Sequence, residues 1–179
     1  CNSTASIARE YDIFGSQQNK HTINFVYQDR EGNMWALTGG GLFKYDDKSD
    51  SFITYPPLGK NNAPYTMCQD QSGNYWIGTW GEGLWQFFPQ KEGEECYKRH
   101  HIINSRSGET EPIFYSMTQD NTFGYLWLLS YNELYALQYT EEGTLVSVDI
   151  HDLVDTHMMY TKIMKDREGN LWLGSYDMA

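Results

Sequence analysis

The chain has 179 residues, which is enough for one domain with a hydrophobic core. Aromatic residues make up 16% of it and 16 residues are Gly, a composition that favours short strands and tight turns over helices. The formal net charge of −11 argues against nucleic-acid binding, and no apolar run reaches the roughly 18 residues that a membrane span needs.

A motif of Asp, Gly and Trp recurs four times along the chain. Its tryptophans, Trp35, Trp76, Trp127 and Trp172, are 41, 51 and 45 residues apart. Such periods are typical of β-propeller blades of four strands each. The Asp and Gly of the successive motifs are Asp29 and Gly32, Asp70 and Gly73, Asp120 and Gly124, and Asp166 and Gly169.

In chain order, the repeat predicts a series of blades. Residues 6–13 are expected to form the last strand of a preceding blade, and full blades follow at 21–58, 62–101 and 112–149. Residues 157–179 predict an incomplete blade. We therefore predict an all-β fold, a partial β-propeller of about three and a half to four four-stranded blades, with residues 1–179 as a fragment of one propeller domain.

The first blade shows how each unit is expected to fold. Strands are predicted at 23–28, 34–38, 42–45 and 52–55, and outer strands of the next two units near 97–101 and 145–148. A turn at 29–33 separates the first two strands, where Asp caps backbone amides and Gly supplies a positive φ.

The second strand of each unit carries apolar residues at consecutive positions, as in 126–129. Continuous apolarity predicts a sheet that is buried on both faces, as in stacked blades. We therefore expect the four motif tryptophans to be core residues rather than a carbohydrate platform. The third unit departs from the others, with one extra residue between Asp120 and Trp127.

The repeat resembles the two-component regulator propeller family. The second unit carries the most of its pattern, through Asp70, Gly73, Asn74, Trp76, Gly78, Thr79, Gly81, Gly83 and Leu84. The third unit loses the Gly-Thr and Gly-Gly pairs. The resemblance covers nearly the whole chain and implies the periplasmic sensor region of a Bacteroidetes hybrid two-component regulator, which senses oligosaccharides released from glycans and precedes a histidine kinase.

Two other functions stay open. Cys1, followed by small polar residues, is what a processed surface lipoprotein would show, and also what an arbitrary boundary of the sequence would show. The chain would then be a binding or scaffold propeller. Propellers also host lyases and glycosidases, but the sequence has no nucleophile motif and no acidic residue that stands out from the turns, so we expect no catalytic residues here.

Candidate ligand-binding residues are aromatic or polar side chains in loops at one end of the blades. The turns after the second strands carry Trp80, Tyr131 and Tyr176, where small residues would serve. The connections between blades reach the same end, because strands in a blade alternate in direction. These connections carry Tyr65, His100, His101 and Tyr160, with Asn62, Arg106 and Asn132 as hydrogen-bonding candidates nearby.

The resemblance implies an oligosaccharide as the ligand, and some of these aromatic side chains would then stack on its sugar rings. The alternative for each of them is a surface aromatic with no role in binding. No metal or cofactor is expected. The Asp-containing turns offer one recurring carboxylate each, which favours a structural turn over a calcium loop. The three cysteines and five histidines show no ligand spacing. An incomplete propeller exposes a blade face and strand edges, which can be covered in two ways. Either the N-terminal strand pairs with the last, incomplete blade, or two chains associate, and of these the sequence favours self-association of the fragment.

Overall fold

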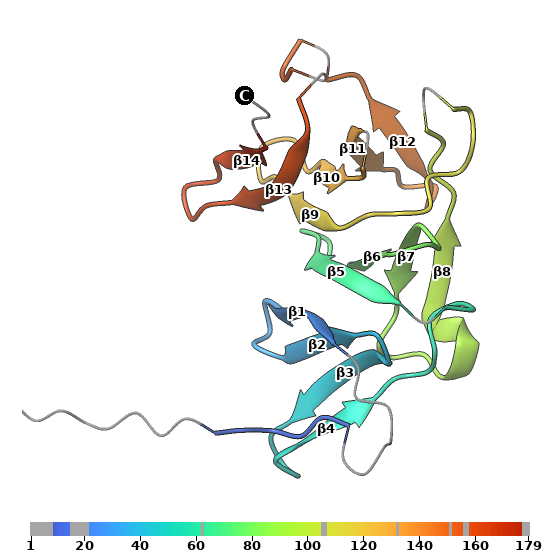
Figure 1. Ribbon diagram of the computed structural model, residues 1–179, viewed down its shortest axis with the longest axis vertical. Helices are drawn as coiled ribbons and strands as arrows, with labels where there is room; N and C mark the ends of the chain where they lie inside the picture. The colour runs from blue at the N-terminus through green and yellow to red at the C-terminus, as the bar shows by residue number, and fades with distance from the viewer. Residues whose placement is uncertain are drawn as a thin grey trace, which may run out of the picture.

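The computed structural model describes residues 9–14, 22–61, 63–104, 107–131, 133–150, 152–155 and 158–176. Within these residues the regular elements are strands and one short 3-10 helix, η1 (Gly93–Cys96). The strands form three four-stranded antiparallel sheets and one two-stranded sheet (Figure 1). The predicted all-β fold is confirmed, and no helix in the described part of the chain could cross a membrane.

Each sheet consists of strands that follow one another in the chain. The first contains β1 (Ile23–Gln28), β2 (Met34–Thr38), β3 (Gly41–Asp46) and β4 (Ser51–Thr54). The second contains β5 (Pro64–Gln69), β6 (Tyr75–Thr79), β7 (Leu84–Phe87) and β8 (Tyr97–His100). The third contains β9 (Ser116–Gln119), β10 (Leu126–Leu129), β11 (Leu134–Tyr139) and β12 (Leu145–Val148), and the fourth β13 (Tyr160–Lys165) and β14 (Leu171–Ser175). The first blade's strands lie within one residue of the predicted ones.

The sheets pack against one another in chain order, and they do not close into a ring (Figure 1). The first strands of successive sheets, β1, β5, β9 and β13, lie side by side along the inner edge of the stack. This arrangement is a partial β-propeller, as the repeat predicts. Because each sheet packs against the next, the core consists of layers between blades rather than one central cluster.

The motif tryptophan of each full blade points into the layer shared with the following blade. Trp35 contacts Tyr75 and Phe87 of the second blade at ring-centroid distances of 5.7 and 5.4 Å. Trp76 contacts Tyr139 of the third blade at 5.2 Å, and Trp127 packs in the layer between the third and fourth sheets. Each of these three indoles is at most 5% exposed, which confirms their predicted place in the core.

Trp172 differs from the other three, and its predicted burial is wrong. Trp172 is 59% exposed. Met164, its register partner on β13, is 52% exposed. The other tryptophans are covered by the next sheet, and no such sheet covers β14 within the described residues. The expectation of a second strand buried on both faces therefore holds for β6 and β10 but not for β14.

The motif Asp holds the turn and the tryptophan together. In the second blade, Asp70 Oδ1 accepts the backbone N–H of Asn74 at 2.8 Å. Its Oδ2 accepts from Asn74 Nδ2 and from Trp76 Nε1, both at 2.9 Å. The turn closes at Gly73, whose φ of 89° favours glycine. The recurring spacing thus exists because one carboxylate satisfies the turn amides and the buried indole N–H.

The third blade reaches the same result with one more residue. Asp120 Oδ1 accepts backbone N–H groups from Thr122 and Phe123 at 2.9 and 2.6 Å. Its Oδ2 accepts from Trp127 Nε1 at 2.8 Å, so the indole bond survives the insertion. Backbone amides replace the Asn side chain of the other units.

A glutamine before the motif Asp links neighbouring blades. Gln69 Oε1 accepts the backbone N–H of Arg30 at 3.0 Å, and Gln119 Oε1 accepts that of Gln71 at 2.5 Å. The fourth unit has Lys165 at this place, and its Nζ donates to Asn121 Oδ1 at 2.7 Å. These bonds fix the relative height of adjacent blades at their turn end.

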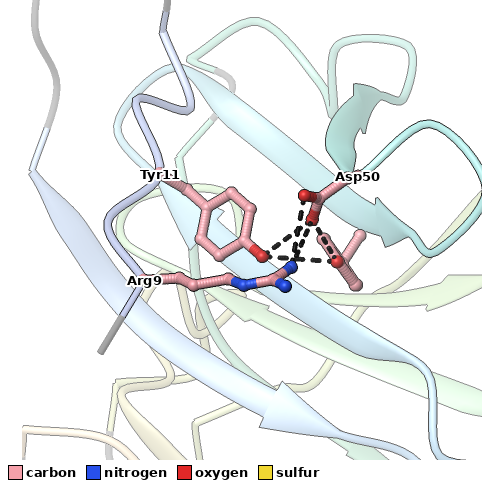
Figure 2. A network of polar contacts seen from close by, with 4 residues as sticks. Arg9, Tyr11 and Asp50 are labelled. Atoms are coloured by element: carbon pink, nitrogen blue, oxygen red, sulfur yellow. Dashed lines mark hydrogen bonds and ion pairs between the residues drawn. The ribbon is translucent and has the colours of Figure 1, made fainter. Parts of the chain in front are cut away.

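Residues 9–14 lie against the outer strands of the first blade, on the face that points away from the second blade. Tyr11 contacts Tyr45 and Phe52 at 5.5 and 5.9 Å between ring centroids. Its hydroxyl donates to Asp50 Oδ1 at 2.8 Å, and Arg9 forms an ion pair with the same carboxylate (Figure 2). The strand expected at 6–13 is not formed over residues 9–13. Instead, side chains hold this segment on the first blade.

Candidate functional site

Four aromatic side chains form a continuous row at one end of the second and third blades. We define the aromatic row as Tyr65, Trp80, Tyr131 and Tyr115. Trp80 contacts Tyr65 at 5.2 Å and Tyr131 at 5.3 Å between ring centroids, and Tyr131 contacts Tyr115 at 6.0 Å. Trp80 is 41% and Tyr131 51% exposed, so the row presents ring surface to solvent.

Backbone bonds between blades fix the central part of the row. Trp80 N donates to Ala63 O at 3.2 Å, and Trp80 also forms an isolated β-bridge with Ile113. On either side of the adjoining turn, Gly81 and Gly83 donate their N–H groups to Pro112 O at 2.9 and 2.7 Å. Trp80 therefore lies on a turn that is held by connections from both sides, which is a rigid mounting for a binding side chain.

The fourth sheet extends this end of the molecule. Tyr115 donates its hydroxyl to Tyr160 O at 2.6 Å, which joins the aromatic row to the start of β13. Burial, followed by the proximity of Tyr131, raises the pKa of Tyr115 above its usual value. Tyr176 lies at the end of β14, where its N–H donates to Met159 O at 3.0 Å. Tyr176 is 66% exposed and has no ring contact with the row in the described part of the chain.

The structure thus brings together Tyr65, Trp80 and Tyr131 of the predicted residues and adds Tyr115, which sequence reasoning missed. A signal was present, because a Tyr followed by Ser or Thr recurs before or at the first strand as Tyr65-Thr66, Tyr115-Ser116 and Tyr160-Thr161. All three predicted hydrogen-bonding candidates, Asn62, Arg106 and Asn132, lie outside the described residues.

The two predicted histidines take different positions. His101 is exposed, but His100 is only 8% exposed and is not a surface loop residue as expected. Its ring contacts Trp76 at 5.2 Å, and its Nε2 lies 3.3 Å from Gln86 Oε1. His100 ends β8, so its side chain belongs to the layer between the second and third blades.

Burial of His100 predicts a pH-dependent stability. Burial, followed by the charges of Lys98 and His101, lowers the pKa of His100 to about 4 from its usual 6.5. The unfolded chain takes up this proton below pH 6.5 and the folded chain only near pH 4, so stability is lost as the pH falls through this interval. We expect a loss of about 2 kcal/mol between pH 7 and pH 4.5 from urea unfolding.

The control for this effect is His100→Gln, which cannot titrate. We expect the variant to be less stable at pH 7 but to have a flatter stability profile between pH 6.5 and pH 4.5. An unchanged slope in the variant would assign the pH dependence to other groups.

A polar cluster lies next to Tyr131 at the outer side of the row. A pocket of about 370 Å³ is lined there by Tyr131, Asn104 and Glu111, among others. Glu111 Oε2 accepts from Asn104 Nδ2 at 3.1 Å and from Tyr135 Oη at 3.2 Å, although Glu111 is only 7% exposed. Aromatic side chains with a few polar groups beside them are typical of sites for small molecules. No repeat position marks these residues in the sequence.

The turn carboxylates are unsuited to hold a cation. Burial opposes ionisation of Asp29, but hydrogen bonds from Trp35, Asn33 and Tyr75 outweigh it and lower its pKa. Its oxygens therefore face N–H and O–H donors rather than the further oxygens that calcium requires. Among the described residues no cluster of three or more metal-ligating side chains occurs. The hydrogen bonds show that the carboxylate of Asp29 holds its own turn and the indole of Trp35.

The sequence profile of the two-component regulator propeller matches residues 58–81 and 155–177. The first segment contains β5, the turn of Asp70 and β6, and the second contains β13, the turn of Asp166 and β14. In these two segments the chain matches the repeat of the two-component regulator propeller. No match was found among curated protein sequences.

Solved structures confirm the propeller architecture. The extracellular domain assigned to a hybrid two-component system of B. thetaiotaomicron has a TM-score of 0.63 at 21% identity, over 86% of this chain and 22% of that one. PorZ of Porphyromonas gingivalis, a surface component of the type-IX secretion system, has a TM-score of 0.63 at 17% identity, over 95% and 27%. Virginiamycin B lyase of Staphylococcus aureus has a TM-score of 0.57 at 14% identity, over 83% of this chain and 47% of the lyase chain.

These likenesses, all at low identity, concern the fold. The chain spans about a fifth of the B. thetaiotaomicron structure that it matches and under half of the lyase structure. The proteins that share this fold include an extracellular domain of a two-component system, a secretion-system component and a lyase. Fold alone therefore does not decide between the functions that the sequence leaves open.

Proposed function

We propose that this region is the ligand-recognition part of an extracytoplasmic sensor and that it binds a glycan-derived oligosaccharide. The aromatic row carries the proposal. Exposed rings on a rigid scaffold stack on the C–H faces of sugars, and the row crosses two blades, which gives it the length for more than one sugar ring. The repeats of the two-component regulator propeller family support the sensor role.

The rest of the proposed protein follows from the same family. We propose that a membrane helix and a histidine kinase lie elsewhere in the full-length protein, and that this region works in the periplasm without catalysis. The scaffold propeller of a surface lipoprotein is the alternative. Sequencing and topology mapping of the full-length protein separate the two, because the sensor requires a downstream membrane segment and the lipoprotein requires a lipid anchor.

Self-association is part of the proposal. The exposed face around Trp172 and Met164 supports it, because the same face of each full blade is covered by another sheet. A second copy or a further blade of the same protein has the right chemistry to cover it.

The aromatic row is tested by removing its central rings. In the first step, a thermal-shift screen of the chain against glycan oligosaccharides identifies a sugar that raises the melting temperature. We expect Trp80→Ala and Tyr131→Ala each to weaken binding of that sugar about tenfold in calorimetry, because each removes one stacking surface.

The matched control is Phe123→Ala, which removes an aromatic side chain that is 65% exposed and lies in the motif turn at the other end of the third blade. It should leave the affinity unchanged. If the isotherms of Trp80→Ala and Tyr131→Ala coincide with that of the unmodified chain, the aromatic row is not the sugar site.

A further inference from the structure

A second pocket lies further out on the second blade. It has a volume of about 660 Å³ and is bounded by the connection between β4 and β5 on one side and by β7, η1 and β8 on the other. This volume is within the range of sites for small organic ligands. None of the aromatic-row residues lines it.

The walls of this pocket are fixed by hydrogen bonds from both sides. Glu82, only 7% exposed, accepts the backbone N–H of Asn61 through Oε1. Its carboxylate fills the place of a side chain at Gly59, where a Cβ would lie 2.0 Å from Oε2 and where φ is +60°. On the opposite wall Tyr97 donates its hydroxyl to Pro56 O at 3.0 Å. The pocket is therefore a built feature of the interface between the first two blades.

Two cations face this pocket in a strongly acidic chain. Arg99 lies over the indole of Trp85, with its guanidinium carbon 5.8 Å from the ring centroid, and Lys60 lies on the connection. Neither forms an ion pair within the described residues. Of the two acidic residues that line the pocket, Glu82 is engaged with the connection, and Glu94 is exposed on η1.

The indole orients the guanidinium. An Arg that is stacked on an aromatic ring presents its N–H groups in one plane, which matches the two oxygens of a carboxylate or the oxygens of a sulfate. Trp85 itself is held by a hydrogen bond from its Nε1 to Glu82 O at 3.2 Å. The partly exposed indole and Tyr97 next to it supply an apolar surface for the body of a ligand.

We propose that this pocket binds a sugar-sized organic anion, with its acidic group on Arg99 and Lys60 and its ring against Trp85. This site is separate from the aromatic row, whose exposed groups are uncharged rings. The region would then bind the face of a sugar ring at the aromatic row and an acidic group at this pocket. The two groups can belong to one ligand or to two.

The test is calorimetry with three related probes, galacturonate, galactose 6-sulfate and galactose. We expect at least one anion to bind, galactose to bind at least about tenfold more weakly, and the affinity for the anion to fall between 50 and 200 mM NaCl. The anion that binds more tightly identifies the acidic group as carboxylate or sulfate.

Variants then locate the binding. Arg99→Gln should weaken binding of the anion at least about tenfold. The affinity of Arg99→Lys should lie between those of the unmodified chain and Arg99→Gln, because Lys keeps the charge but lacks the planar guanidinium. Lys98→Gln is the matched control. It removes the same charge from the adjacent residue of β8, whose Nζ contacts Gly143 O of the third blade instead.

Equal binding of galactose and the anions, no anion binding at millimolar concentration, or an unchanged affinity in a folded Arg99→Gln variant would each overturn the proposal. Trp80 does not line this pocket, so Trp80→Ala should leave the affinity for galacturonate unchanged if the acid binds here rather than at the aromatic row. A failure here with a positive result at the aromatic row leaves the proposed function standing.

Discussion

Replacing Asp70 with Ala is expected to lower the free energy of unfolding by about 3 kcal/mol. Asp70 is 4% exposed, and its carboxylate accepts three hydrogen bonds from Asn74 and Trp76. The substitution leaves the indole N–H of Trp76 without a partner in a layer where water does not replace it. The measurement is the midpoint of urea unfolding, with fluorescence of the tryptophans as the signal.

Asp166→Ala is the matched control, because the same three bonds occur there at 2.8 to 3.0 Å from Asn170 and Trp172. Hydrogen bonds from Trp172, followed by those from Asn170, lower the pKa of Asp166 to about 2, but water has access to both partners. The loss of stability should be clearly smaller than for Asp70→Ala. Equal losses in the two variants would contradict the role assigned to burial.

The contrast between these two aspartates shows what the repeat in the sequence can and cannot predict. The spacing of Asp, Gly and Trp reflects bonds within one turn, so the motif predicts the strands on both sides of it closely. Burial of the Trp depends on the next sheet, which the motif does not describe. For this reason Trp76 and Trp172 differ greatly in exposure, although they occupy the same position in the motif.

The candidate site follows the same division. Trp80 and Tyr131 could be predicted because they follow motif strands, and the order of strands in a blade brings their turns to one end. His100 could not be placed, because the residue at which β8 ends decides whether its side chain faces the core.

The pocket with Arg99 and Lys60 has no counterpart in the repeat. It arises where the connection after β4 packs on the outer strands of the next blade. Lys60 and Arg99 are 39 positions apart in the sequence and share no motif. Contacts of this kind between blades depend on the length and path of one connection, which no periodic pattern in the chain specifies.

Close approach of neighbouring blades predicts the second large effect, at Gly78 in β6. A Cβ at this position would lie 2.7 Å from Phe114 O, 2.8 Å from Thr66 Cγ2 and 3.0 Å from Met117 Cε. The nearest of these atoms belongs to the backbone, so it cannot move aside without shifting the third blade. We expect Gly78→Ala to lower the free energy of unfolding by about 3 kcal/mol in urea unfolding.

Gly174 provides the matched control, because it occupies the same motif position in β14. A Cβ there would lie 3.7 Å from Thr161 Oγ1 and 3.8 Å from Lys162 Cβ, which are ordinary contact distances. Gly174→Ala should leave stability unchanged or raise it by up to about 1 kcal/mol, because Ala restricts the unfolded chain more than Gly does. If both variants lose the same stability, the cost of Ala lies in the strand itself, and the packing of the second blade on the third does not require Gly78.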